Sequence, residues 1–173
     1  PGATRTILKQ LESHGLHWDG DLLYQSQRSD AYEAALAQLH LDGLSYSCDC
    51  NRQRVSELGG IYDNRCRQRQ VGCDSAIRLK LPEHNSDSII AFDDLIMGNY
   101  RQNLSTEVGD FVIQRRDRLF SYQLAVTVDD QFQNISHIIR GADLLDSTPR
   151  QLYLQRCLGV SAKQISAMQY AHL

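Results

Sequence analysis

Three segments of different hydrophobic periodicity predict an α/β fold. They are a helical repeat over 31–43, a strand-like alternation over 75–81, and a strand, turn and helix in succession over 135–159. A strand that leads through a glycine-containing turn into a helix is the unit from which helix-covered parallel sheets are built. We therefore expect helices packed on a sheet that contains parallel strands.

Two helices are expected before the first strand. The first covers about 4–14 and ends at Gly15, and its apolar residues at helical spacing are Ile7, Leu8 and Leu11. A loop over 18–29 follows. In the second helix Asp30 is the expected N-cap and Gly43 the end. The apolar face of this second helix consists of Ala35, Leu36 and Leu39.

Strands are expected in the middle of the chain. SAIRLKL (75–81) alternates polar and apolar residues, and Pro82 ends it. SIIAFDDLIMGNY (88–100) has the pattern of a strand that passes into a turn, and DFVIQRRD (110–117) that of a further strand. The polar stretch NLSTEVGD (103–110) connects these two.

The last part of the chain has the strongest strand, turn and helix pattern. The apolar run ISHII stops at Arg140, as a buried parallel strand does. Thr148 is the expected N-cap, and Pro149 the first-turn proline, of a helix that ends at Gly159. Open parallel sheets bind ligands at the carboxyl ends of their strands, so Arg140 and Asp143 lie where we expect a substrate.

The composition is that of a soluble globular chain. Its 173 residues are 42% hydrophobic and 23% charged, and no apolar run reaches the roughly 18 residues of a membrane span. We therefore expect no membrane partner. The net charge of −3 gives no overall basic field for nucleic acid, so any RNA contact must be local. We interpret two arginine clusters, at 65, 67 and 69 and at 115, 116 and 118, as exposed solvating side chains.

Five cysteines, four of them within 48–73, suggest a metal site. An odd number of cysteines without a secretory signal argues for a reducing, cytoplasmic location and against a disulfide framework. Zinc takes four ligands in a tetrahedron. Cys48 and Cys50 can share one ion, and Cys66 returns to them from a loop that two glycines, Gly59 and Gly60, allow to fold back.

Residue chemistry alone does not decide which side chain is the fourth metal ligand. Cys73 is favoured because it completes four thiolates, whereas the phenol of Tyr62 must lose its proton to bind a dication. Buried cysteines without a metal are the alternative interpretation. Cys157 stands apart and is expected in the core.

Three runs of sequence closely resemble those of the glutamyl-queuosine tRNA(Asp) synthetase family. Its members are truncated paralogues of bacterial glutamyl-tRNA synthetases. The runs are GLHWDGDLLYQSQRSDAY, CDCNRQRVSELGGIYDNRC, and DFVIQRRDRLFSYQLAVTVDDQFQNISHIIRGADLLDSTPRQLYLQ. YQLAVTVDD and IIRGADLL are shared with glutamyl-tRNA synthetases in general, and the GGIYDNRC loop favours the queuosine family. The resemblance covers almost the whole chain.

The resemblance implies a class I synthetase catalytic domain of Rossmann type over 1–173, with a zinc-binding insertion at 46–74. The family's zinc is held by three cysteines and a tyrosine, which correspond to Cys48, Cys50, Tyr62 and Cys66. This favours Tyr62 over Cys73 as the fourth ligand.

The resemblance also implies a reaction in two steps. Glutamate and ATP, with Mg²⁺, form glutamyl-adenylate, and the glutamyl group is then esterified to queuosine in the anticodon of tRNA(Asp). Tyr122 and Arg140 correspond to the glutamate site. We expect Asp143 and Leu144, in the GADLL turn, to flank the nucleotide. Without the family, Tyr122 is an ordinary half-buried aromatic residue and Arg140 an ion-pair partner of Asp143 or Asp129.

The neighbouring carboxylates Asp129 and Asp130 have several possible roles. They could bind magnesium with the ATP phosphates or do acid–base work, but we prefer Asp130 as the N-cap of a turn.

The HIGH-type and KMSKS-type segments of class I synthetases do not occur in this sequence. We therefore expect a fragment that lacks both ends and does not activate glutamate by itself. Two other hypotheses remain, part of a glutamyl-tRNA synthetase and a non-catalytic, zinc-stabilised RNA-binding remnant. A monomer is the default expectation.

Overall fold

The computed structural model describes residues 2–72, 74–83 and 86–173. Its α-helices are α1 Ala3–Ser13, α2 Ser29–Leu41, α3 Arg52–Glu57, α4 Leu104–Glu107, α5 Tyr122–Phe132, α6 Ser147–Cys157 and α7 Ala162–Ala167. Its strands are β1 Ser45–Cys48, β2 Ala76–Leu79, β3 Ile89–Asp94, β4 Gly98–Asn103, β5 Val112–Gln114, β6 His137–Arg140 and β7 Gln169–His172. Short 3-10 turns cover Gln25–Gln27 and Ala142–Leu144.

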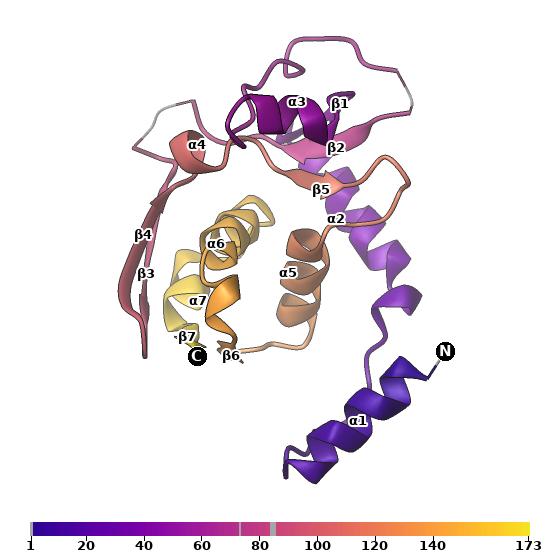
Figure 1. Cartoon of the computed structure of the whole chain (residues 1–173), viewed down its shortest axis with the longest axis vertical. Helices are drawn as coiled ribbons and strands as arrows, with labels where there is room; N and C mark the ends of the chain where they lie inside the picture. Colours follow the sequence, from indigo (N-terminus) through magenta and orange to yellow (C-terminus); the bar gives the residue numbers. More distant parts are fainter. Residues whose placement is uncertain (1, 73, 84–85) are drawn as a thin grey trace.

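The strands form two sheets. One is antiparallel with the order β1-β2-β5, and the other has the order β4-β3-β7-β6. In the second sheet β3 and β4 make an antiparallel hairpin, whereas β7 runs parallel to both β3 and β6. Figure 1 shows α5 and α6 between the two sheets, and α6 packs against both α5 and β3. The parallel strands confirm the α/β prediction.

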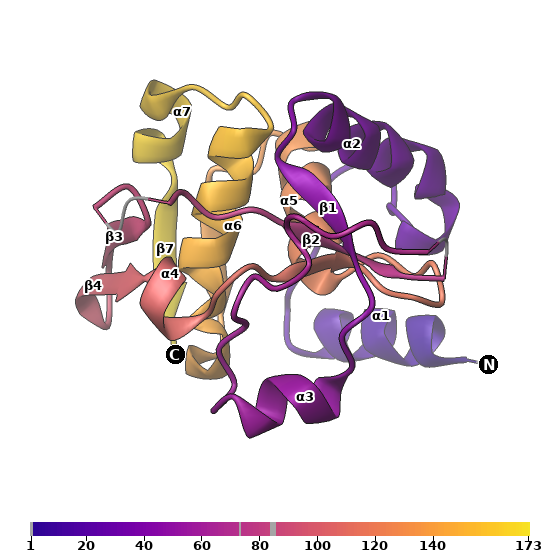
Figure 2. The same ribbon diagram turned by 90° about the horizontal axis from the view of Figure 1, so that it is seen from above.

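One hydrophobic core joins the two sheets and the helices between them. Its fully buried members come from both sheets and from four helices: Leu39, Leu79, Ile90, Leu104, Ile113, Leu124 and Leu154. A smaller buried cluster lies beside it under α3 and consists of Tyr46, Cys48, Tyr62 and Cys66. Figure 2 shows α3 projecting to one side of the sheet that contains β1 and β2.

The predicted N-caps of two helices are wrong. Helix α2 begins at Ser29, so Asp30 lies in its first turn, and α6 begins at Ser147, so Thr148 lies inside the helix. Neither side chain caps its helix because each helix starts earlier than predicted; the Thr148 hydroxyl instead accepts a hydrogen bond from Arg140 at 2.7 Å. Pro149 does lie in the first turn of α6, as predicted.

The strand at 135–139 is parallel but not buried. In the described residues β6 is an edge strand that pairs only with β7, and Ile139 is 71% exposed. The apolar run therefore gave the right type of strand and the wrong burial. Asp130 is also placed differently from its prediction, because it lies in the body of α5 and does not N-cap a turn.

Several elements were not predicted. These are β1, α3, α5, α7, β7 and the second strand of the β3–β4 hairpin, and α4 lies within the connection expected at 103–110. Helix α1 covers the predicted range, but none of its residues is buried, and Figure 1 shows it apart from the other helices. Among the described helices, none has the length and apolar character of a membrane span.

Candidate functional site

The first candidate site, here called the cysteine site, consists of Cys48, Cys50, Tyr62 and Cys66. Cys48 ends β1, and Cys50 lies between this strand and α3. Asn51 caps α3 by accepting a hydrogen bond from the Arg54 amide at 2.9 Å, which turns the chain sharply after Cys50. The chain then returns through the two glycines predicted to fold it back, whose φ angles of +77° and +90° suit glycine.

A close backbone contact fixes Tyr62. It forms a parallel bridge with Gly109, and a Cβ on Gly109 would lie 2.6 Å from the Tyr62 carbonyl oxygen. Only glycine allows this approach. The Tyr62 hydroxyl, in turn, accepts a hydrogen bond from the Cys66 amide at 3.0 Å. The site is therefore built on backbone contacts as well as on side chains.

The four side chains of the cysteine site meet at one point. Cys50 Sγ lies 3.6 Å from Cys66 Sγ and 3.7 Å from Tyr62 Oη, and Cys48 Sγ lies 3.4 Å from Tyr62 Oη. A tetrahedron with zinc–sulfur bonds of about 2.3 Å has edges of about 3.8 Å. The three thiols also lie within 4.8 Å of one another. This spacing fits a tetrahedrally coordinated metal ion, and Cys73, the other candidate ligand, lies outside the described residues.

Burial raises the pKa values of three of the cysteine-site side chains, and hydrogen bonds from neighbouring groups lower some of them. Burial raises the pKa of Cys48, but hydrogen bonds with Tyr62 and Arg78 outweigh it, so that the pKa lies below its ordinary value. Burial raises the pKa of Cys66 and, more strongly, that of Tyr62. Cys48 is thus the most readily ionised of these three groups.

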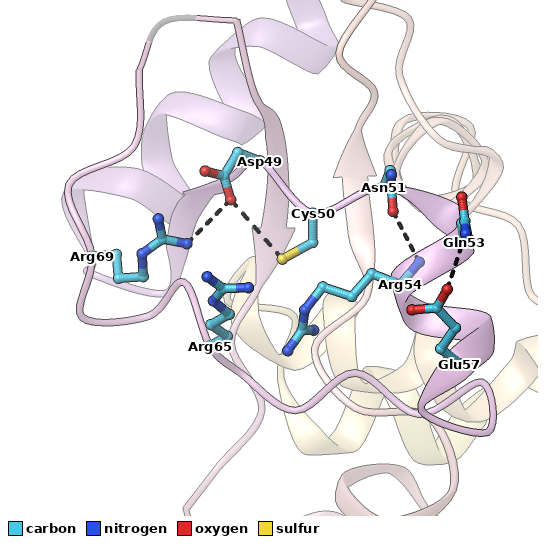
Figure 3. A pocket seen from close by; sticks show the side chains of 8 residues that line it. All are labelled: Asp49, Cys50, Asn51, Gln53, Arg54, Glu57, Arg65 and Arg69. Atoms are coloured by element: carbon cyan, nitrogen blue, oxygen red, sulfur yellow. Dashed lines mark hydrogen bonds and ion pairs between the residues drawn. The ribbon is translucent and has the colours of Figure 1, made fainter.

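A pocket of about 550 Å³ opens beside the cysteine site. Figure 3 shows the guanidinium groups of Arg54, Arg65 and Arg69 around Cys50. Arg69 pairs with Asp49 at 3.4 Å, and Asp49 also accepts a hydrogen bond from Cys66 Sγ at 3.3 Å. Arg54 likewise pairs with Asp63 at 2.6 Å, so carboxylates balance part of the positive charge beside the thiols.

Asp110 attaches the cysteine loop to the sheet. This carboxylate is 1% exposed and accepts hydrogen bonds from Tyr46 Oη at 2.6 Å, Arg67 Nε at 2.6 Å and the Leu81 amide at 2.8 Å. Arg67 therefore has a structural partner, contrary to the interpretation of its cluster as solvating arginines. The prediction of an exposed side chain is confirmed for Arg115, which pairs with Asp117 at the surface.

The second candidate site surrounds Arg140 at the carboxyl end of β6. The guanidinium donates from Nε to His172 Nε2 at 3.0 Å and from Nη2 to Thr148 Oγ1 at 2.7 Å and Gln151 Oε1 at 2.9 Å. Nη1 donates to Tyr122 Oη at 3.2 Å. The structure thus brings together Tyr122 and Arg140, the two residues assigned to one ligand, and no described aspartate pairs with this arginine.

Tyr122 borders a cleft of about 1000 Å³ that extends to Cys50. Its side chain is 47% exposed. Four arginines and two aspartates contribute to the lining: Arg52, Arg78, Arg115, Arg116, Asp74 and Asp117. The cleft is therefore locally basic although the chain has a net charge of −3, and it joins the two candidate sites.

Asp143 and Leu144 lie in the 3-10 turn that follows β6. Asp143 is exposed, and its carboxylate folds back over Gly141, where it would collide with any Cβ. Leu144 is partly buried. Both residues are thus at the strand end where a ligand was expected, and their role in nucleotide binding stays a prediction.

The two neighbouring aspartates of α5 differ in environment. Asp129 is buried and accepts hydrogen bonds from Arg28 at 2.9 Å, Tyr32 at 2.7 Å and Gln25 at 3.1 Å, so its role is structural. Burial raises the pKa of Asp130 to about 6, with Arg140 opposing the rise and Asp129 adding to it.

Three polar residues of the Arg140 site were not predicted from the sequence. Gln151 lies within α6, Asp94 ends β3 and His172 ends β7. QYAH has no period-two alternation that would have predicted a strand ending at His172, and only the fold shows that this segment is a strand beside β6.

Residues 1–172 match the family described as tRNA synthetases class I (E and Q), catalytic domain. The chain therefore belongs to this family of class I tRNA synthetase catalytic domains. Its α/β fold with parallel strands agrees with that membership.

The similar curated proteins carry a more particular name. Glutamyl-Q tRNA(Asp) synthetase of Pseudomonas putida KT2440 is 52% identical over 162 residues, and that of Pseudomonas fluorescens Pf-5 is 53% identical over 162 residues. Each alignment covers 93% of this chain and 53% of the relative, so the chain spans about half the length of the curated relatives it matches.

A solved structure supports the fold independently. The glutamate tRNA ligase from Elizabethkingia meningosepticum, in complex with its amino acid, has a TM-score of 0.77 and 25% sequence identity. The match covers 100% of this chain and 39% of that one.

Proposed function

We propose that this chain is the core of an ATP-dependent ligase that attaches glutamate to queuosine in the anticodon of tRNA(Asp). The main support is identity of 52–53% with Glutamyl-Q tRNA(Asp) synthetases, against 25% with a solved glutamate tRNA ligase. A part of a glutamyl-tRNA synthetase is the second candidate, and the experiment below separates the two.

The hydrogen-bond count at Arg140 supports glutamate binding. A guanidinium has five N–H groups. The contacts with His172, Thr148, Gln151 and Tyr122 use four, which leaves one N–H on Nη1. The Tyr122 hydroxyl accepts from Nη1 and so keeps its own proton to donate.

One carboxylate can accept both of the remaining protons. The spare N–H of Arg140 and the O–H of Tyr122 lie side by side, and a charged acceptor strengthens both bonds. All other donors of Arg140 point to protein groups. We therefore assign these two side chains to a carboxylate of glutamate.

The reaction consists of two group transfers. A carboxylate oxygen of glutamate attacks the α-phosphorus of ATP, the bond to the bridging oxygen breaks, and pyrophosphate leaves. A hydroxyl oxygen of the queuosine cyclopentenediol then attacks the acyl carbon, loses its proton, and AMP leaves. Mg²⁺ neutralises phosphate charge when it accompanies ATP. Asp143 and Leu144 are proposed to flank the nucleotide.

The basic cleft is proposed to accept the RNA. Its arginines line the same cleft as Tyr122 and Cys50, so RNA phosphates in the cleft would bring a nucleoside near the proposed glutamate pocket. This location satisfies the requirement that RNA contact be local on a chain with a net charge of −3.

Zinc is proposed as the ion of the cysteine site, held by Cys48, Cys50, Tyr62 and Cys66. Three sulfur donors and a tetrahedral spacing suit zinc better than magnesium or calcium, which prefer oxygen. When bound, zinc supplies structural cross-linking. Its ligands would then join the end of β1 to the loop before 67, next to Cys50 on the wall of the cleft.

The test uses the complete polypeptide in glutamate-dependent ATP–pyrophosphate exchange without tRNA, followed by transfer of labelled glutamate to tRNA(Asp). We expect exchange without tRNA and transfer only to tRNA(Asp) that contains queuosine. Exchange that requires tRNA(Glu) would identify a glutamyl-tRNA synthetase, and no exchange under either condition would leave the non-catalytic alternative.

A pair of variants tests the glutamate pocket. Arg140→Gln should raise the KM for glutamate at least about tenfold, because a charged hydrogen bond is lost. Arg150→Gln is the matched control, since Arg150 lies on α6 and pairs with Asp146 at 3.2 Å. An unchanged KM in Arg140→Gln would contradict the assignment.

A further inference from the structure

His172 is a fully buried histidine between a carboxylate and a guanidinium. Its Nδ1 lies 2.6 Å from Asp94 Oδ2, and its Nε2 lies 3.0 Å from Arg140 Nε. The side chains of both Asp94 and His172 have no exposed surface. Burying such a polar group costs free energy unless its donors and acceptors are all hydrogen-bonded. His172, Asp94 and Arg140 must therefore be considered together.

The contacts determine where the imidazole proton lies. Arginine Nε carries a hydrogen and can only donate, so His172 Nε2 must be the acceptor. The proton of a neutral imidazole is therefore on Nδ1, where it is donated to the Asp94 carboxylate. Thr148 agrees with this tautomer, because its hydroxyl accepts from Arg140 Nη2 and can donate its own proton to Nε2 at 3.3 Å.

Asp94 is itself held rigidly. Its Oδ1 accepts hydrogen bonds from the amides of Ile96 at 3.0 Å, Met97 at 2.9 Å and His172 at 3.2 Å. Burial alone would raise the pKa of Asp94, but these bonds and the one from the imidazole lower it to about 2. A fixed negative charge thus stands at the turn of the β3–β4 hairpin.

We propose that Asp94 and His172 form a positioning relay that fixes the guanidinium of Arg140 for recognition of a substrate carboxylate. Asp94 orients the imidazole, and the imidazole accepts the hydrogen bond from Arg140 Nε, a different nitrogen from the one that donates to Tyr122. Thr148 and Gln151 hold Nη2, so Nη1 alone turns toward Tyr122 and the ligand. His172 is in this scheme a positioning residue, and its assignment to glutamate binding rests on the proposed function.

The site draws on five separate parts of the chain, one of which is α6 with Thr148 and Gln151. Arg140 ends β6, His172 ends the adjacent β7, Asp94 ends β3 on the other side of β7, and Tyr122 begins α5. The register pairs Arg140 with His172 directly. Parallel pairing therefore brings three strand ends together behind one guanidinium.

Kinetics of the complete polypeptide test the relay. His172→Phe keeps an aromatic ring but removes both ring nitrogens, and we expect the KM for glutamate to rise roughly tenfold with a smaller change in kcat. His172→Gln offers Oε1 as an acceptor for Arg140 Nε and should recover most of this loss. His137→Gln, an exposed position on β6, is the matched control. A KM that is the same in His172→Phe and in the control overturns the relay.

A spectroscopic measurement separates the relay from the proposed function and from misfolding of the variants. ¹⁵N NMR of the imidazole in the unmodified protein should show a proton on Nδ1 and none on Nε2. A proton on Nε2 would overturn the relay, whatever the substrate. Failure of the unmodified enzyme to activate glutamate would instead reject the proposed function and leave the tautomer as an independent result.

Discussion

Arg78 lies over the ring of Tyr62, with its guanidinium carbon 3.8 Å from the ring centroid, and its Nε donates to Cys48 Sγ at 3.1 Å. A single buried cation therefore contacts two members of the cysteine site. Three thiolates and a phenolate carry more negative charge than one divalent ion neutralises. A guanidinium beside them lowers the cost of burying that excess charge.

Arg78→Met should consequently weaken metal binding. Partners in the outer shell of a metal site contribute about 10–100-fold to affinity, so we expect a loss in that range. Competition between the protein and a zinc chelator measures it. Arg101→Met is the control, since Arg101 is exposed on β4, in the other sheet. Equal zinc retention by both variants would show that Arg78 only fills space.

The identity of the fourth ligand gives a second prediction. Tyr62→Phe should lower zinc retention because it removes the oxygen that lies 3.4 Å from Cys48 Sγ and 3.7 Å from Cys50 Sγ. Cys73→Ser should retain zinc. The zinc content of both purified variants, measured by elemental analysis, decides the question, and the reverse pattern would make Cys73 the ligand.

Loss of the Asp110 carboxylate should destabilise the whole chain. Asp110→Asn leaves Arg67 without its charged partner in a buried position, and we expect the free energy of unfolding to fall by about 3 kcal/mol. Chemical denaturation measures this change. Asp117→Asn is the control, because its pair with Arg115 is exposed and should contribute less than about 1 kcal/mol. Similar losses in both variants would argue against a special role for Asp110.

Asp130 should make stability depend on pH. Its pKa is raised to about 6 from an ordinary 3.8, so the folded state binds this proton more tightly than the unfolded state does. The resulting stabilisation is present below about pH 4 and is lost as the pH rises through 6. Asp130→Asn should therefore raise the Tm at pH 8 relative to the unmodified chain.

The same comparison at low pH provides the control for Asp130. At pH 3.5 the aspartate is mostly protonated in both states, so the Tm difference between Asp130→Asn and the unmodified chain should be much smaller than at pH 8. The expected gain at pH 8 is on the order of 1 kcal/mol after allowance for the partial exposure of this carboxyl. A Tm difference that does not change with pH would contradict the prediction.

The cysteine site could be predicted from the sequence to a large extent because its members are close along the chain. Short spacing and two glycines indicate a common ligand without knowledge of the fold. Arg78 could not be predicted in this way. It reaches Cys48 only because β1 and β2 pair, and pairing depends on tertiary contacts.

The Arg140 site was predictable only in part. The end of an apolar run at Arg140 marked a strand terminus, but the partners Asp94 and His172 are 46 and 32 positions away along the printed sequence. Helix α5 was missed because Val126, Thr127 and Val128 are β-branched, a pattern that disfavours helix. Burial of one face of α5 against the core overrides that preference.

The contacts of Asp110 with Tyr46, Arg67 and Leu81 also bear on how this loop can be engineered or exchanged between proteins. Residues 46–74 contain every cysteine-site ligand, but not the carboxylate that holds the end of the loop or the glycine that Tyr62 approaches. A graft of that segment alone into another scaffold would transfer the ligands without their support. The smallest transferable unit runs from β1 through β5, and its boundaries are those of the antiparallel sheet.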